Sequence, residues 1–269
     1  MPELPEVENT RRYLIKSGLP GRTLIRATIS WARTVRLPML EDFVLGIPGK
    51  RVEAVNRRGK YLLLPLDSTE TLILHLGMTG RLRVQSPSQP APPLLRHTVS
   101  LDDGRELRFI DPRKFGHLWL VDDPEQVVGT LGPEPLDGGF TPAVLAQVLR
   151  GRSTPIKALL LEQSVIAGLG NLYADESLYL AGIHPERLAS DLSAAEVSRL
   201  RDAVVGALTR SVAEYDRARK EFWPDPPFAL SPWTIPREAG AACPRCGGPV
   251  KMIRVRGRST YFCPQCQTG

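Results

Sequence analysis

Alternation of apolar and polar positions runs through the first half of the chain and predicts short β-strands with one buried face. A helix over residues 1–17 is expected before them, because Val7, Leu14 and Ile15 share one side of a helix and Gly18 ends the pattern. The expected strands cover residues 23–29, 51–56, 61–66, 71–75, 80–85, 97–102, 106–110 and 116–121. Strands this short, at this spacing, predict a β-sandwich or a barrel.

The second half of the chain carries helix signals instead. Thr141 and Thr154 each precede a proline, which is the pattern of an N-cap followed by proline at the first helical position. Ser193 and Glu196 form a capping box that opens a long helix. We therefore expect an α+β protein of several parts: an N-terminal β-sandwich domain over 1–131, a hinge over 132–139, a helical domain over 140–239 and a ribbon over 240–269.

All cysteines of the chain lie near its end, in two C-x-x-C pairs: Cys243 and Cys246, then Cys263 and Cys266. This spacing predicts a ribbon that holds one tetrahedral zinc ion. The alternative is two disulfides. The sequence shows no signal peptide and no apolar run of about 18 residues, so we expect a reducing, cytoplasmic location. Four thiolates leave no position for water, so the zinc is expected to be structural.

Charge between the cysteine pairs is one-sided. The whole chain has a net charge of +6, and residues 243–269 contain no acidic residue. The segment reads as a hairpin with a turn near Gly257 and the basic residues Arg245, Lys251, Arg254, Arg256 and Arg258. A solvated surface is the plain interpretation of such a run. A rigid hairpin with only positive charge favours a phosphate-binding surface, as in proteins that bind nucleic acid.

The N-terminus carries a second candidate for chemistry. Cells usually remove an initiator Met that precedes a residue as small as proline, and removal of Met1 leaves Pro2 as a free secondary amine. Such an amine can act as a nucleophile, and Glu3 places a carboxylate directly beside it. The alternative is that Pro2 and Pro5 only open a helix.

Five motifs together resemble the formamidopyrimidine-DNA glycosylases and the related endonuclease VIII enzymes, and the first of these branches more closely. They occur in the family's order at residues 2–8, 75–80, 111–116, 163–176 and 243–266. The resemblance implies a bacterial enzyme of base excision repair that acts on double-stranded DNA containing damaged bases or abasic sites. It implies a monomer in the cytosol, associated with the nucleoid, that excises 8-oxoguanine and formamidopyrimidine and then cuts the abasic strand by β,δ-elimination.

The resemblance also assigns roles residue by residue. Pro2 is the nucleophile, Glu3 the general acid and Glu6 a supporting carboxylate, while Lys60 holds a phosphate at the lesion. Met78, Arg113 and Phe115 fill the space that a flipped base leaves in the duplex, and Lys157 contacts a purine. His75, Asn171 and Arg258 are the remaining DNA-binding residues. The helices around Asn171 are expected to form the family's helix–two-turn–helix element. The resemblance calls for no redox cofactor and no catalytic metal.

One region departs from the family pattern. Residues 209–233 should form the loop over the lesion, but the usual glycines are missing and an aromatic, proline-rich segment stands at 222–233. Phe222 or Trp223 could stack on a base, or the segment could pack on the domain. Two alternatives to purine repair therefore stay open: the same chemistry on oxidised pyrimidines, and a protein that binds abasic or damaged DNA without catalysis.

Overall fold

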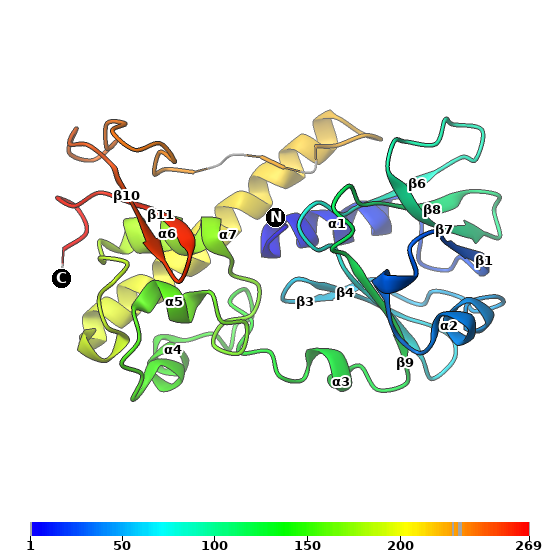
Figure 1. The fold of residues 1–269 in the computed structure, drawn as a ribbon, viewed down its shortest axis with the longest axis horizontal. Coiled ribbons are helices and arrows are strands. Elements are labelled where there is room, and N and C mark those ends of the chain that lie inside the picture. The colour runs from blue at the N-terminus through cyan, green and yellow to red at the C-terminus, as the bar shows by residue number, and fades with distance from the viewer. Residues whose placement is uncertain (1, 228, 231–232, 269) are drawn as a thin grey trace. The chain divides into compact units, whose positions relative to one another are not determined.

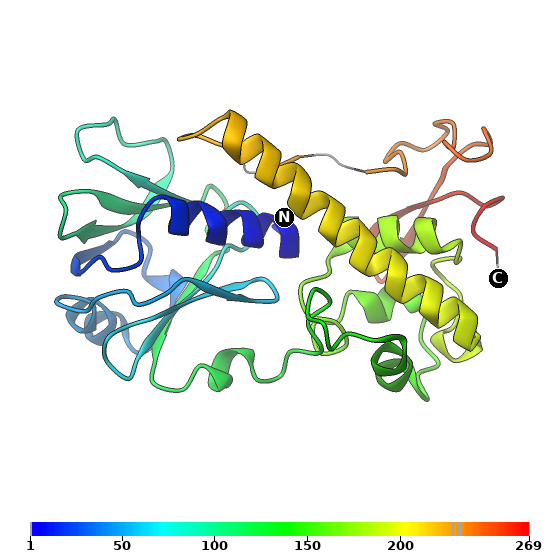
Figure 2. The same ribbon diagram turned by 180° about the vertical axis from the view of Figure 1, so that it is seen from behind.

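The computed structural model describes residues 2–227, 229–230 and 233–268. The chain forms two compact units (Figures 1 and 2). One consists of residues 1–129 and 218–229, and the other of residues 130–217 and 230–269. Among the described residues, no helix is both long and apolar enough to span a bilayer.

The first unit is the expected β-sandwich with a leading helix. Helix α1 (Leu4–Lys16) precedes the strands, and α2 (Leu40–Gly46) and α3 (Glu125–Val128) are short. One sheet has the order β1-β7-β8-β6, and the other has the order β2-β9-β5-β4-β3. The strands are β1 (Leu24–Ile29), β2 (Val35–Leu37), β3 (Asn56–Arg58), β4 (Tyr61–Pro65), β5 (Thr71–His75), β6 (Arg81–Gln85), β7 (Leu95–Leu101), β8 (Glu106–Ile110) and β9 (His117–Val121).

Burial explains these strands. In β4, Leu62 and Leu64 point into the core while their neighbours are half-buried, which is the expected alternation. The expected strand over 51–56 is mostly wrong. Arg51 and Val52 make only isolated bridges, and the paired strand β3 begins at Asn56. The two-residue turn after β3 fixes the register by pairing Arg58 with Tyr61. From there the ladder reaches back only to Asn56, which pairs with Leu63.

The second unit is helical with a two-stranded hairpin. Its helices are α4 (Pro142–Leu149), α5 (Ile156–Leu160), α6 (Asn171–Ala181) and α7 (Ala194–Glu221), and its strands are β10 (Lys251–Val255) and β11 (Arg258–Phe262). Two of the three predicted caps are present, whereas Thr154 is not the cap that was predicted: the N-cap of α5 is Pro155, which makes no side-chain cap hydrogen bond. Thr141 Oγ1 accepts a hydrogen bond from the Val144 N–H at 3.3 Å, and the Ser193 N–H donates to Glu196 Oε2 at 2.8 Å.

Helix α7 corrects the expectation of a lesion loop over 209–233. Residues 209–221 are helical, and Ser211 and Tyr215 continue the buried face of the helix. Neither Gly nor Pro interrupts this stretch before Pro224, so nothing stops the helix earlier. The part of 222–233 that the structure describes is non-helical, while Phe228, Ser231 and Pro232 lie outside the described residues. Residues 218–229 belong to the first unit rather than to the expected helical domain.

Candidate functional site

The first turn of α1 holds the predicted nucleophile and its carboxylates. Pro2 is half-buried and stands directly before Glu3, which is the N-cap of the helix. The Glu3 N–H donates to Glu6 Oε2 at 2.8 Å, and the Glu3 side chain accepts from the Glu6 N–H, so the two residues form a reciprocal capping box. Both are buried, and Leu4 anchors the turn in the core. The backbone next to the Pro2 nitrogen is therefore held in one conformation.

Lys60 lies in the turn between β3 and β4. The turn needs Gly59, whose φ of +54° is in the left-handed region. Lys60 is buried, and its positive charge helps to lower the pKa of the neighbouring His75. Burial is the main cause of that shift, His117 adds to it, and the resulting pKa of about 4 leaves His75 neutral at pH 7.

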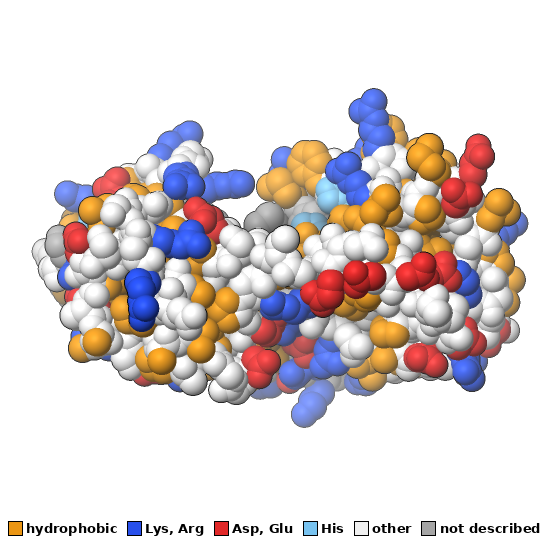
Figure 3. Space-filling view, turned by 90° about the horizontal axis from the view of Figure 1, so that it is seen from below, with side chains coloured by type: hydrophobic (Ala, Val, Ile, Leu, Met, Phe, Trp, Pro, Cys, Tyr) orange, Lys and Arg blue, Asp and Glu red, His pale blue; other side chains and the backbone are white. Residues whose placement is uncertain are grey.

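The four expected DNA-binding residues of the first unit line one hollow of about 730 Å³: His75, Met78, Arg113 and Phe115. Its other charged residues are Arg33, Arg36 and Lys114, and no acidic side chain lines it among the described residues. Figure 3 shows histidine side chains on this unit with basic and hydrophobic side chains around them. Phe115 is 45% exposed, although aromatic side chains usually gain from burial.

The loop of Gly77 and Met78 packs closely against the loop of Phe115. Gly77 has a φ of +62°, and a Cβ on it would lie 2.3 Å from the Phe115 carbonyl oxygen. Asp111 accepts from Thr79 Oγ1 at 2.8 Å and from the Gly116 N–H at 2.7 Å. The lack of a side chain at Gly77 and Gly116 allows this close packing of the two loops. Met78 and Phe115 are thus presented by a rigid support.

In the second unit, the structure places Asn171 beside the hairpin residue that follows Arg258. Asn171 is the first residue of α6, and its Nδ2 donates to the Ser259 carbonyl oxygen at 3.0 Å. Arg258 begins β11 and is exposed. An amide nitrogen has two hydrogens, so Asn171 keeps a second donor for an anion near Arg258.

Lys157 is different from the expectation. Its side chain is fully buried, and its ammonium lies 2.6 Å from Asp175 Oδ1, which is also buried. It also donates to Thr260 Oγ1 at 2.6 Å and to the Ser259 carbonyl oxygen at 3.2 Å. Thr260 and Ser259 engage two donors of the ammonium, and the buried Asp175 carboxylate pairs with its charge. The structure therefore does not support a contact between Lys157 and a purine, and it favours a role in holding β11 against α5 and α6. Sequence patterns alone do not reveal such burial.

Trp223 follows α7 and packs on α1 within the first unit. Its ring centroid lies 5.6 Å from that of Tyr13, and Lys16 Nζ lies 4.3 Å from its centroid. This is the packing alternative that the sequence left open. Phe222 is 52% exposed and remains available for other contacts.

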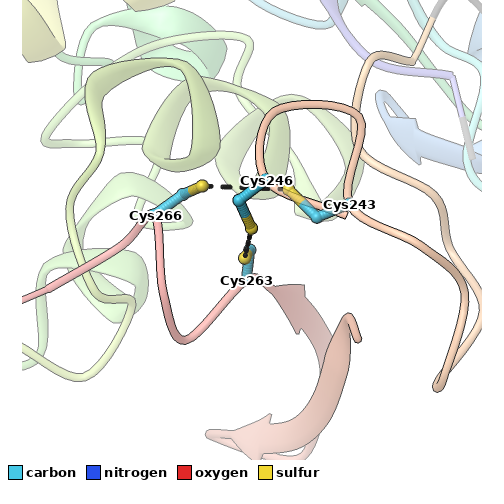
Figure 4. Close-up of side chains that lie close together, drawn as sticks. All are labelled: Cys243, Cys246, Cys263 and Cys266. Atoms are coloured by element: carbon cyan, nitrogen blue, oxygen red, sulfur yellow. Dashed lines mark hydrogen bonds between the residues drawn. The ribbon is translucent and has the colours of Figure 1, made fainter. Parts of the chain in front are cut away.

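The four cysteines converge at one end of the hairpin (Figure 4). Their sulfur atoms all lie within 4.8 Å of one another. The Cys243–Cys266 and Cys246–Cys263 sulfur pairs are separated by 3.8 and 3.5 Å, too far for a disulfide of about 2.05 Å. A tetrahedron with zinc–sulfur bonds of about 2.3 Å has edges of about 3.8 Å, so the arrangement fits zinc.

One further buried group was not predicted to matter. Glu8 stands within the first sequence motif, and Arg11, Arg12 and Arg57 surround its carboxylate. Burial opposes ionisation of Glu8, but hydrogen bonds from Arg11 and Arg12 and the charges of Arg11 and Arg57 outweigh it and lower its pKa to about 2. The sequence could have indicated this cluster, because Glu8 lies two residues after Glu6, and the arginines at 57 and 58 lie shortly before Lys60.

Comparison with known protein families accounts for most of the chain. Residues 1–118 match the formamidopyrimidine-DNA glycosylase N-terminal domain, and residues 131–221 match the H2TH domain of the same enzymes. Residues 240–269 match a zinc finger found in FPG and IleRS. The zinc-finger match agrees with the sulfur geometry, so the four cysteines form the site of one structural zinc ion.

Curated relatives and solved structures agree with these matches. The formamidopyrimidine-DNA glycosylase of Herpetosiphon aurantiacus is 44% identical over 99% of this chain and 100% of its own length. That of Acidiphilium cryptum is 41% identical with the same coverage. The Lactococcus lactis FPG mutant G226P, in complex with DNA containing Fapy-dG, has a TM-score of 0.90 and 32% identity over the full length of both chains. MutM in complex with DNA containing carbocyclic 8-oxo-G has a TM-score of 0.87 and 32% identity, also over both full chains.

Proposed function

The chain belongs to the formamidopyrimidine-DNA glycosylase family, whose members repair DNA by base excision and carry AP lyase activity, and we propose how its residues perform this reaction. It binds double-stranded DNA, excises oxidised purines and cleaves the abasic strand. The observation that carries the proposal is the first turn of α1. There the capping box of Glu3 and Glu6 fixes the backbone directly after the Pro2 nitrogen.

The reaction begins after Met1 has been removed. The Pro2 nitrogen attacks C1′ of the damaged nucleotide, the C1′–base bond breaks, and the base leaves with the bonding electrons. Glu3 protonates the ring oxygen as the sugar opens, which gives an iminium between Pro2 and C1′. The iminium makes the C2′ protons acidic, so loss of a proton expels the 3′ phosphate, and a second elimination expels the 5′ phosphate. Glu6 supports the step by holding the Glu3 backbone.

The hollow of the first unit supplies the contacts to the duplex. An enzyme that acts on a base inside DNA must extrude it and fill the gap. Phe115 and Met78 provide apolar wedges, and Arg113 provides hydrogen-bond donors for the opposite base, which loses its pairing partner when the damaged base is extruded. Lys60 binds the phosphate at the lesion, and His75 adds a neutral donor beside it.

The second unit binds phosphates through Asn171 and Arg258. We infer that both bind one anion, because Asn171 donates to the Ser259 carbonyl oxygen and Arg258 directly precedes Ser259. The zinc ribbon holds the hairpin on which Arg258 lies. Such contacts add affinity without reading sequence. The enzyme acts as a monomer in the bacterial cytosol, associated with the nucleoid through this positive charge.

Oxidised purines are the proposed substrates because solved structures of similar enzymes hold DNA with Fapy-dG or carbocyclic 8-oxo-G. Oxidised pyrimidines remain the second candidate. The observation that favours them is the segment after α7, where Trp223 packs on α1 and the expected flexible lesion loop is replaced.

The test uses the purified protein and duplexes that each carry one defined lesion. We expect strand cleavage at 8-oxoguanine and formamidopyrimidine, with products that carry phosphate on both sides of the gap. An undamaged duplex serves as the control. Preference for thymine glycol would support the second candidate, and binding without cleavage of any duplex would contradict the enzymatic proposal.

A further inference from the structure

Glu8 is a buried carboxylate to which the proposed reaction gives no task. Its side chain is 7% exposed and accepts hydrogen bonds from three arginines. Arg11 reaches it with Nε at 3.0 Å and Nη2 at 2.8 Å, and Arg12 reaches it with Nε at 2.6 Å. Arg57 completes the cluster with Nε at 3.1 Å. A carboxylate with this many charged donors is ionised and fixed in place.

Arg57 connects Glu8 to the turn that carries Lys60. Its side chain is 9% exposed, and its Nη1 donates to the Gly59 carbonyl oxygen at 3.0 Å. That carbonyl belongs to the peptide bond directly before Lys60. One guanidinium therefore spans from a carboxylate on α1 to the backbone of the β3–β4 turn. Figures 1 and 2 both show α1 next to β3 and β4.

The same helix begins at Leu4, two residues after the proposed nucleophile Pro2. Glu8 lies one helical turn after Leu4, about 6 Å along the axis at about 1.5 Å per residue, and the extended N-cap Glu3 joins Leu4 to Pro2. Arg11 adds a second link, because its Nη1 donates to the Val55 carbonyl oxygen at 3.4 Å, just before β3. Helix α1 is thus fixed at both ends of β3, at Val55 before the strand and through Arg57 at the turn after it.

We propose that Glu8 and Arg57 are positioning residues that hold the Lys60 turn against α1, so that Lys60 meets the lesion phosphate while Pro2 meets C1′. The inference rests on the proposed function, because it needs Pro2 and Lys60 to act on one nucleotide. Neither Glu8 nor Arg57 touches the substrate in this account. Lysine cannot replace Arg57, because a single ammonium does not reproduce the fork that contacts both Glu8 and Gly59.

The experiment is a double-mutant cycle with Lys60. Single-turnover cleavage of a duplex with a preformed abasic site is measured for the wild type, Glu8→Gln, Lys60→Ala and the double variant. Glu8→Gln should slow cleavage about ten- to a hundredfold, which is the size expected of a small misplacement. It should slow the Lys60→Ala variant less than about twofold, because the residue through which it acts is already gone.

Two further measurements separate positioning from other roles. The pH profile of Glu8→Gln should keep the wild-type shape, because Glu8 transfers no proton. Glu53→Gln, an exposed Glu of the same unit, is the matched control and should leave the rate unchanged. Arg57→Lys should reproduce the Glu8→Gln effect, and it carries the test if Glu8→Gln does not fold, as judged by its melting temperature.

The inference is overturned if Glu8→Gln slows the wild type and Lys60→Ala by the same factor, since independent effects multiply. A folded Glu8→Gln or Arg57→Lys protein with the wild-type rate would overturn it as well. Failure of the proposed function looks different. In that case the wild type itself leaves the abasic duplex uncut, and the positioning role falls with it.

Discussion

Glu3 has two tasks in a single turn of helix. Its backbone and side chain take part in the capping box with Glu6, and its carboxyl is the proposed proton donor next to Pro2. Glutamine keeps an oxygen that can accept from the Glu6 N–H but has no acidic proton. The cap and the chemistry can therefore be separated by one substitution.

Glu3→Gln should bind lesion DNA nearly as well as the wild type but cleave it at least about a hundredfold more slowly, the usual contribution of a general acid. Binding is measured by fluorescence anisotropy and cleavage under single-turnover conditions. Glu41→Gln, at an exposed position of α2, is the matched control and should change neither the affinity for lesion DNA nor the cleavage rate. A Glu3→Gln protein that cleaves at the wild-type rate would remove Glu3 from the mechanism.

Residues in short motifs were the easiest to predict from sequence. Met78 and Phe115 were assigned by resemblance alone, and the structure brings both to one hollow. Lys157 also matched a family position, yet its ammonium is paired inside the second unit. A motif gives the residue type and the order, whereas burial depends on partners such as Asp175 that lie elsewhere in the chain.

At the scale of elements, strands with clear alternation and helices with clear caps were predicted to within a few residues. The expected strands at 71–75 and 106–110 coincide with β5 and β8. The main error was α7, which continues through residues that the family resemblance assigned to a loop. The local sequence itself favours a continued helix, because residues 209–223 contain no helix-breaking Gly or Pro.

Trp223 tests the element after α7. Trp223 packs on Tyr13 and Lys16 of α1, so Trp223→Ala should lower the free energy of unfolding by about 1–3 kcal/mol and the melting temperature by several degrees. It should slow cleavage at 8-oxoguanine and at a preformed abasic site by the same factor. Phe222→Ala is the neighbouring control with an exposed ring and should not lower the melting temperature. A loss confined to 8-oxoguanine would instead show that Trp223 stacks on the base.

At the scale of the whole molecule, the zinc site determines whether the second unit can present Arg258. Binding of zinc to ribbons of this size contributes about 10–16 kcal/mol to folding. The small core around the cysteines, with Tyr179, Ile235 and Val250, is otherwise modest. The sequence was sufficient to predict this site, because cysteine spacing alone specifies the ligands.

Metal analysis should therefore find one zinc per chain, and Cys243→Ser should lose both the zinc and binding to every duplex. Gln265→Ala, an exposed position in the second knuckle, is the control and should keep both. Zinc-free protein that binds DNA with unchanged affinity would contradict the structural role of the ribbon.

The most direct test of the account is the identity of the atom that attacks the sugar. The wild-type protein is mixed with lesion DNA in the presence of borohydride, which reduces an iminium to a stable amine. The account predicts a covalent protein–DNA adduct on a chain that lacks Met1, with mass mapping that places the nucleotide on the Pro2 nitrogen. An adduct on Lys60 or on any other lysine, or efficient cleavage with no adduct at all, would contradict it.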